Sequence, residues 1–319
     1  RFKHRSAAKL NKSAKSKLNN IINTKINEQA KDILSSEQSE FQISNTNQLT
    51  WKSMPIALIS KSANILLPKI QLLADDYLDV NNRNKLQNKL ENWLSFHIKK
   101  ELPGLVKFNN AKLTGLLSAI QFSIIENLGV IQKSKLGIDF DQLTKEEKRE
   151  LRSYGVFIGE NFLYFKKIFE DKQFILRLML YNIYNDNPHA IEPIKNDKVI
   201  ENIPDTTFFQ NLGYFYSSKQ YVRPDLIESV LSSIREKMHK EKSSKFALDS
   251  ELIKKLELKK SFTEKLLREL DFIKVRNTRK NKNQFWIKKK VTKKTYDEVD
   301  YSEINAFSVL KKLNNASNH

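Results

Sequence analysis

The sequence predicts a mainly α-helical protein with small β-hairpins, in which a helical part is followed by a smaller C-terminal unit. Only seven Gly and seven Pro occur among the 319 residues, which favours helices with short connections. Apolar residues recur at spacings of three and four over much of the chain, as in helices with one buried face. Short runs of β-branched and aromatic residues beside turn residues predict the hairpins.

The N-terminal part, residues 1–47, is predicted to be a basic helical arm and a linker. Apolar residues at helical spacing from Leu18 to Leu34 predict a helix over residues 13–35. Two roles are open for this helix: a basic arm on nucleic acid, or an apolar stripe that docks on another domain, which we favour. The polar residues 35–47 are rich in Ser, Gln and Asn and predict a linker.

Residues 48–135 predict a strand-led domain built on a helical hairpin. Extended segments are expected at 49–52, 55–59 and 65–68, helices at 81–101 and 112–128, and a turn at 102–105 between the helices. The apolar residues expected on the buried helix faces are Leu86, Leu90, Trp93, Leu94, Ile98, Leu113, Leu116, Leu117, Ile120, Ile124 and Leu128.

Residues 136–203 predict a helix, a β-hairpin, a second helix and a loop. The elements are expected at 145–155, at 156–158 paired with 162–165, at 171–184 and at 185–203. Gly159 is expected to supply the hairpin turn. The hairpin aromatics could stack on nucleic-acid bases, but large aromatic residues in such runs more often belong to the core.

The last unit, residues 204–290, predicts the element order of a winged helix-turn-helix, and residues 291–319 form a tail. Pro224 suits the first position of a helix and Asp249 suits an N-cap. Ser261 and Glu264 match the capping-box pattern that starts another helix. The expected elements are helices at 225–239 and 249–256, a helix from Ser261, and strands at 245–248, 272–275 and 284–287.

The net charge of +19 is unevenly distributed along the sequence. Residues 271–294 hold ten Lys or Arg against one Asp, and residues 1–27 hold eight against no acidic residue. A lysine-rich composition alone would also raise the net charge. Because the charge is clustered, we favour a polyanionic partner, RNA or DNA.

The candidate contacts to nucleic acid are cations of the last unit. Lys265 and Arg268 could reach a major groove from the helix, but Glu264 and Glu269 on the same helix would oppose DNA. This mixed charge predicts that the hairpin contacts the phosphate backbone, and it argues against tight sequence reading. The predicted contact residues are Lys265, Arg268, Arg276, Arg279, Lys280, Lys282, Lys288, Lys289 and Lys290.

Several kinds of chemistry have no counterpart in the sequence. The absence of Cys excludes disulfides, thiolate metal sites and Cys nucleophiles. The five His residues are scattered, and His97 is expected to be half-buried beside the Trp93 stripe. The carboxylate pairs Asp75/Asp76 and Asp139/Asp141 are expected to be loop residues or helix caps. We predict no catalytic centre, no metal site and no cofactor site in this chain.

No apolar run approaches the roughly 20 residues that a membrane helix needs, and no signal peptide is visible. We therefore expect a cytoplasmic protein without a membrane partner. The chain begins with Arg1 instead of Met, so we expect it to be part of something longer.

Several stretches, in order, resemble the region that follows the motor in alphaproteobacterial superfamily 2 helicases, which are related to the mitochondrial RNA-degradosome helicase. The similarity runs from about residue 41 to the end of the chain. The stretches are QLTWKSMPIALI (48–59), ILLPKIQLLADDYL (65–78), LENWLSFHI (90–98), LTGLLSAIQFSIIENLGV (113–130), LRSYGVFIG (151–159) and NAFSVL (305–310).

The resemblance implies a C-terminal accessory region of an ATP-dependent helicase, whose motor domains would belong to the same polypeptide. The family's ATP- and Mg²⁺-binding motifs have no counterpart in this sequence. ATP and Mg²⁺ are therefore expected only for the missing motor, and no catalytic residue is carried over. Two alternatives are a stand-alone winged-helix transcription regulator and a structural scaffold for a partner protein.

Overall fold

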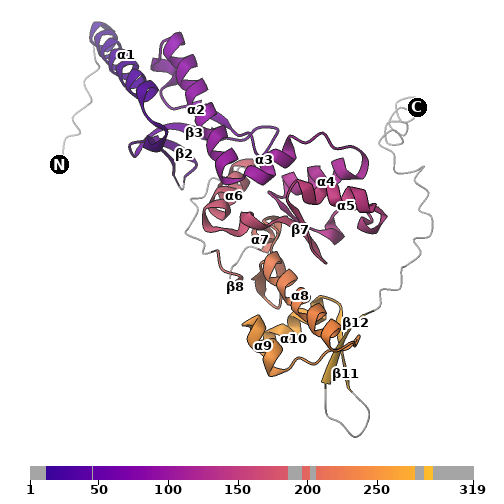
Figure 1. The fold of residues 1–319 in the computed structure, drawn as a ribbon. Coiled ribbons are helices and arrows are strands. Elements are labelled where there is room, and N and C mark those ends of the chain that lie inside the picture. Colours follow the sequence, from indigo (N-terminus) through magenta and orange to yellow (C-terminus); the bar gives the residue numbers. More distant parts are fainter. Residues whose placement is uncertain (1–11, 45, 186–195, 202–205, 277–283, 290–319) are drawn as a thin grey trace, which may run out of the picture.

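The computed structural model describes residues 12–44, 46–185, 196–201, 206–276 and 284–289, apart from the side chains of residues 12–15, 206–208 and 276. The elements follow one another in chain order, from α1 at one end of the molecule to β11 and β12 at the other (Figure 1). The described chain is mainly helical with four small antiparallel sheets, as predicted. Among the described residues, no helix is both long and apolar enough to span a bilayer.

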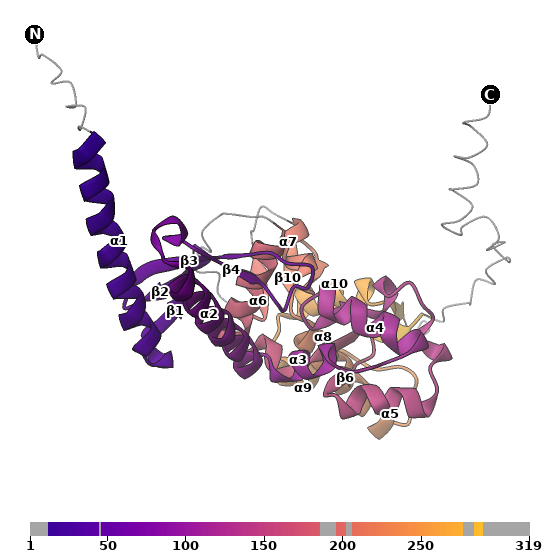
Figure 2. The same ribbon diagram turned by 90° about the horizontal axis from the view of Figure 1, so that it is seen from above.

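At one end, a four-stranded antiparallel sheet packs with two long helices. The helices are α1 (Lys12–Ser35) and α2 (Val80–Glu101), and the strands, in spatial order, are β1 (Phe41–Ile43), β2 (Gln48–Trp51), β3 (Met54–Ser60) and β4 (Lys69–Leu72). The first half of α1 extends beyond the body, where Leu18 and Ile21 are exposed, whereas Ile33 is buried (Figure 2). The predicted stripe of α2 is buried along its whole length, from Leu86 to Ile98.

Three predictions for this end of the molecule are wrong. The predicted linker 35–47 contains β1, whose Phe41 is buried against Trp93 of α2. The extended segment expected at 65–68 is a turn, and the strand comes after it, at β4. The turn expected at 102–105 is the start of a separate helix, α3 (Pro103–Asn109), because Pro103 occupies its first position, where no backbone N–H is needed.

The middle of the molecule contains three helices and a three-stranded sheet. The helices are α4 (Gly115–Glu126), α5 (Lys145–Ser153) and α6 (Asp171–Tyr184), and the strands lie in the order β5 (Val130–Gln132), β7 (Phe162–Phe165), β6 (Val156–Ile158). The predicted hairpin is confirmed, with Gly159 N–H donating to Phe162 O at 2.9 Å. Phe162, Tyr164 and Phe165 are buried, so its strands belong to the core.

Arg177 of α6 lies at the centre of this region and is fully buried. Its guanidinium donates to Leu128 O at 2.7 Å, to Leu212 O at 2.8 Å and to Ile168 O at 3.5 Å. Burial lowers the pKa of Arg177 to about 10, so the group stays charged at neutral pH. One side chain therefore binds three connecting segments that are far apart in the sequence.

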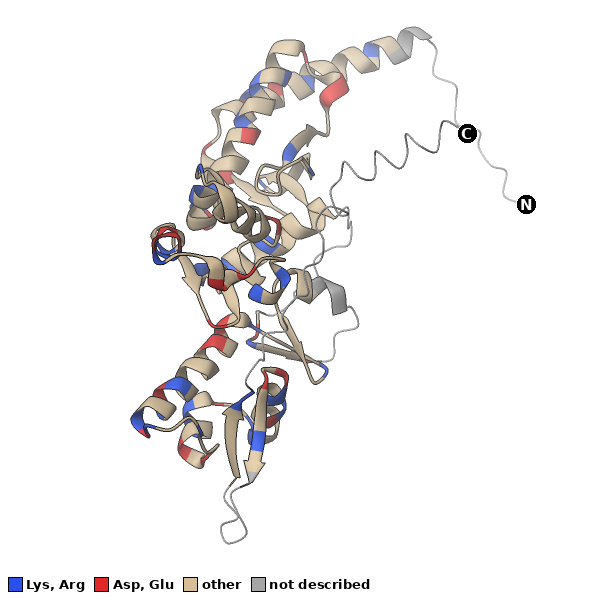
Figure 3. Cartoon of the chain, turned by 90° about the vertical axis from the view of Figure 1, so that its right-hand side faces the viewer, with Lys and Arg blue, Asp and Glu red and all other residues tan. Residues whose placement is uncertain are grey.

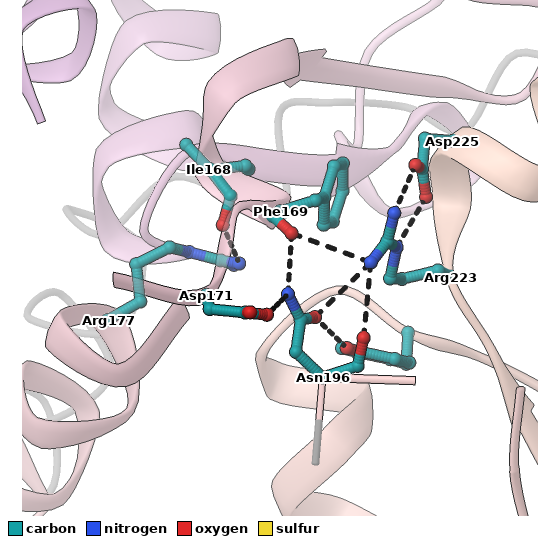
Figure 4. Close-up of polar contacts among 8 residues, drawn as sticks. Ile168, Phe169, Asp171, Arg177, Asn196, Arg223 and Asp225 are labelled. Carbon is teal, nitrogen blue, oxygen red and sulfur yellow. Dashed lines mark hydrogen bonds and ion pairs between the residues drawn. The ribbon is translucent and has the colours of Figure 1, made fainter. Parts of the chain in front are cut away.

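A second network joins the middle of the molecule to a further small sheet (Figure 4). Arg223 makes a bidentate pair with Asp225, at 2.8 and 2.6 Å, and its guanidinium lies over the ring of Phe169. Asn196 donates to Phe169 O at 2.5 Å and accepts from the Tyr214 hydroxyl. These contacts anchor the three-stranded sheet, in the order β8 (Val199–Glu201), β10 (Gln220–Val222), β9 (Phe215–Ser217), beside the short helix α7 (Thr206–Asn211).

The far end contains the three helices and the two hairpin strands predicted for the last unit, but no strand at 245–248. They are α8 (Pro224–Lys240), α9 (Ser250–Leu256), α10 (Lys260–Glu269), β11 (Phe272–Arg276) and β12 (Gln284–Lys288). Asp249 caps α9 by accepting from Leu252 N–H at 2.9 Å, as predicted. The prediction of a capping box at Ser261 is wrong. Helix α10 begins one residue earlier, and the side chain of Lys259, its N-cap residue, makes no capping hydrogen bond.

Candidate nucleic-acid interface

One face of the β11–β12 hairpin is apolar, and this face packs against the rest of the C-terminal unit. Trp286 and Phe272 are buried, and Phe246 pairs with Trp286 through backbone hydrogen bonds in both directions, at 3.1 and 2.8 Å. The segment expected as a strand at 245–248 is thus a single bridge. The strand register places Arg276 opposite Gln284, so the cationic residues 277–283 connect two adjacent strand ends.

Two lysines on the strands themselves have carboxylate partners. Lys274 pairs with Glu264 of α10 at 3.2 Å and lies 5.7 Å from the ring centre of Trp286. Lys288 pairs with Glu160 in the β6–β7 turn, and burial lowers its pKa. Lys288, which was predicted to contact phosphate, is therefore already paired with a carboxylate of the protein.

The remaining predicted contacts fall into two groups. Lys265 and Arg268 are exposed on α10, and Lys289 is exposed just after β12. Arg276 ends β11, but its side chain is outside the described set. Arg279, Lys280, Lys282 and Lys290 also lie outside the described residues. Over the described part of the chain, positive and negative residues are interspersed (Figure 3).

The two acidic residues of α10 both have partners in the protein. Glu264 pairs with Lys274, and Glu269 accepts from the backbone N–H and the hydroxyl of Ser218, at 3.2 and 3.3 Å. Ser218 lies in the β9–β10 turn, so this turn sits against α10. Lys265 lines a groove of about 320 Å³ between α10 and the β8–β10–β9 sheet, and Glu201 of β8 lines the same groove. The β9–β10 sheet and turn therefore lie beside α10 at Lys265 and Glu269.

A buried carboxylate joins the hairpin end to the middle of the molecule. Glu228 of α8 accepts from three consecutive backbone N–H groups, those of Glu160, Asn161 and Phe162, at 2.6, 2.7 and 3.0 Å. Burial raises the pKa of Glu228, while these donors and the charges of Lys133 and Arg235 oppose the rise. The neighbouring Glu160 in turn pairs with Arg235 and with Lys288.

This junction was not predicted from the sequence, although Gly159 was a signal for it. Gly159 is not among the residues with positive φ, so the turn itself does not demand glycine. A Cβ at this position would lie 2.2 Å from Cδ of Glu228, which real contacts do not allow. Glycine is needed here because the carboxylate approaches the turn so closely.

Gly159→Ala is therefore expected to destabilise the protein by about 1–3 kcal/mol, the usual cost of overpacking. In a Glu228→Ala background the three atoms nearest to the added methyl group are gone, so the same substitution should cost less. Urea unfolding of the two single variants and the double variant measures this coupling. An equal cost of Gly159→Ala in both backgrounds would show that Glu228 is not the reason for glycine.

Other polar residues singled out in the sequence have structural roles. Asp139 caps a short 3-10 helix by accepting from Asp141 N–H at 3.0 Å, and Asp75 pairs with Arg83 at 2.8 Å. His97 is half-buried, as expected, and it also stacks on Trp93, with ring centres 5.2 Å apart. Within the described ranges, no three His, Asp or Glu side chains are grouped so that they could hold a metal ion.

Comparison of the chain with protein-family models, with curated proteins and with solved structures gave no match.

Proposed function

We propose that this chain binds nucleic acid through the basic hairpin of a C-terminal winged helix-turn-helix, without strong sequence preference. The observation that carries the proposal is the β11–β12 register, which brings Arg276 and Gln284 together at adjacent strand ends. The seven residues that connect them include Arg279, Lys280 and Lys282 and no acidic residue. Cations that meet phosphates fix the position of a protein on nucleic acid but carry no sequence information.

The element order supports the winged-helix assignment. Helix α8, the bridge at Phe246, helices α9 and α10, and the β11–β12 hairpin come in the same order as in that motif. The β9–β10 turn against Glu269 favours contact through the hairpin over insertion of α10 into a major groove. The same contact disfavours the alternative of a stand-alone regulator, because sequence reading would require α10.

We further propose that this region works beside the motor of a superfamily 2 helicase, as its accessory grip on RNA or DNA. The stretches between residues 48 and 310 that resemble that family occur in the family's order along the chain, and this supports the assignment. The residues of this chain do not fit ATP or Mg²⁺, because no phosphate-loop motif is present. No step of ATP hydrolysis or unwinding is therefore assigned to it.

The purified chain should bind random-sequence single-stranded and duplex oligonucleotides at low salt, as measured by fluorescence anisotropy. The affinity should fall steeply as salt rises, since each phosphate contact releases condensed counterions. Absence of binding to both probes at low salt would contradict the proposal. A strong preference for one duplex sequence, together with a dimer, would instead support the regulator.

A further inference from the structure

A groove lies where the α1–α2 end of the molecule meets its middle part, and its lining combines aromatic, cationic and amide side chains. It has a volume of about 560 Å³, within the range of small-ligand sites, and lies between α2, α6 and the segment that leads into β1. Phe96 of α2 and Ile175 of α6 face this groove, and their exposed fractions are 50% and 54%. Two large apolar side chains from different helices thus present an uncovered surface in one concave site.

Three aromatic residues that line the groove pack on one another. His97 lies nearly parallel to Trp93, at 5° between the ring planes, and Phe41 packs on Trp93 with ring centres 5.8 Å apart. The Trp93 indole N–H donates to Gln38 O at 3.0 Å, which fixes the ring orientation. Burial lowers the pKa of His97, so its imidazole is neutral at neutral pH. The side of the groove beside Phe96 is therefore preorganised and needs little rearrangement to bind a ligand.

The charged groups that line the groove are all cationic. Lys100 extends from α2 and Lys172 from α6, and no Asp or Glu is among the described lining residues. The nearby Glu101 accepts from Gln173 at 2.9 Å. Gln38 and Gln42 also line the groove, and a glutamine amide can both donate to and accept from base edges.

We propose that this groove binds single-stranded nucleic acid, with a base stacked on Phe96 and the flanking phosphates at Lys100 and Lys172. Exposed aromatic rings beside cations bind single strands, because the base faces are free there, whereas stacking hides them in a duplex. The cations and amides favour a nucleic acid over an apolar peptide. The inference rests on the proposed function in that the ligand is nucleic acid, but it uses a different surface from the hairpin.

Phe96→Ala should weaken binding of the full chain to a labelled oligonucleotide of about 12 unpaired thymidines by roughly tenfold or more, the usual effect of losing one stacking ring. Lys100→Ala/Lys172→Ala should weaken the same complex and flatten its salt dependence. Phe96→Trp should retain affinity, and its added tryptophan emission should be quenched when the oligonucleotide binds. Duplex affinity should be unchanged in all three variants.

The matched controls are Phe122→Ala, an exposed Phe of α4, and the exposed pair Lys135→Ala/Lys145→Ala. Neither should change single-strand binding as the groove variants do. The proposal is overturned if Phe96→Ala binds like the unchanged chain, if Phe122→Ala weakens binding equally, or if Phe96→Trp emission does not respond. Duplex binding without any single-strand binding would overturn the groove and leave the hairpin proposal intact. Single-strand binding that is lost with Phe96→Ala but unaffected by hairpin substitutions would support the groove alone.

Discussion

Replacing Arg177 by Met should lower the free energy of unfolding by about 3–5 kcal/mol, because it removes one donor group from three buried carbonyl oxygens at once. Met fills much of the same volume but donates no hydrogen bond. The carbonyl oxygens of Leu128, Ile168 and Leu212 would lose their guanidinium donor inside the protein. Each buried acceptor left without a partner costs about 1–3 kcal/mol. Part of this sum is offset, because the variant no longer has to bury a charged guanidinium.

The matched control is Arg149→Met, the same substitution at an exposed position of α5, which should change stability by less than about 0.5 kcal/mol. Urea unfolding followed by circular dichroism measures both variants. A loss below about 1 kcal/mol for Arg177→Met would show that water or neighbouring groups satisfy these carbonyls, and that Arg177 does not hold the three segments together.

The second large effect is expected on the affinity for nucleic acid when the cations of the hairpin are removed. The variant Arg276→Ala/Arg279→Ala/Lys280→Ala/Lys282→Ala should lose affinity for random duplex by on the order of 10³-fold at 0.1 M salt, if all four cations contact phosphates. The loss should be equal across duplex sequences, because phosphate contacts carry no sequence information. A loss confined to particular sequences, measured by anisotropy on several duplexes, would instead point to base contacts.

The long helices were predictable from sequence because each extends its apolar stripe over several turns. Helices α2, α6 and α8 begin and end within a few residues of the predicted positions. By contrast, β5 and β8 are only three residues long, and their partners, β7 and β10, are not the next strands in the sequence. No local pattern of three residues specifies such a strand.

For the candidate site, the sequence predicted the cations and the two strands, but not the carboxylates that pair with some of these cations. The charge cluster and the flanking apolar runs were visible in the sequence, and β11 and β12 lie where they were expected. The carboxylate partners were not visible, because Glu160 is 128 residues from Lys288 and 68 residues from Glu228. Ion pairs of this kind arise from tertiary packing, and they show which of the described cations already have a carboxylate partner.

The most direct test of the hairpin proposal is the slope of log affinity against log salt concentration for random duplex. The four-cation hairpin variant should have a slope shallower than that of the unchanged chain by about 3–4, because each phosphate contact contributes roughly 0.9. The control variant Lys85→Ala/Lys135→Ala/Lys145→Ala/Arg149→Ala removes four exposed cations outside the hairpin, and its slope should match that of the unchanged chain. Equal slopes for the hairpin variant and the unchanged chain would contradict the account, because the phosphate contacts would then lie elsewhere.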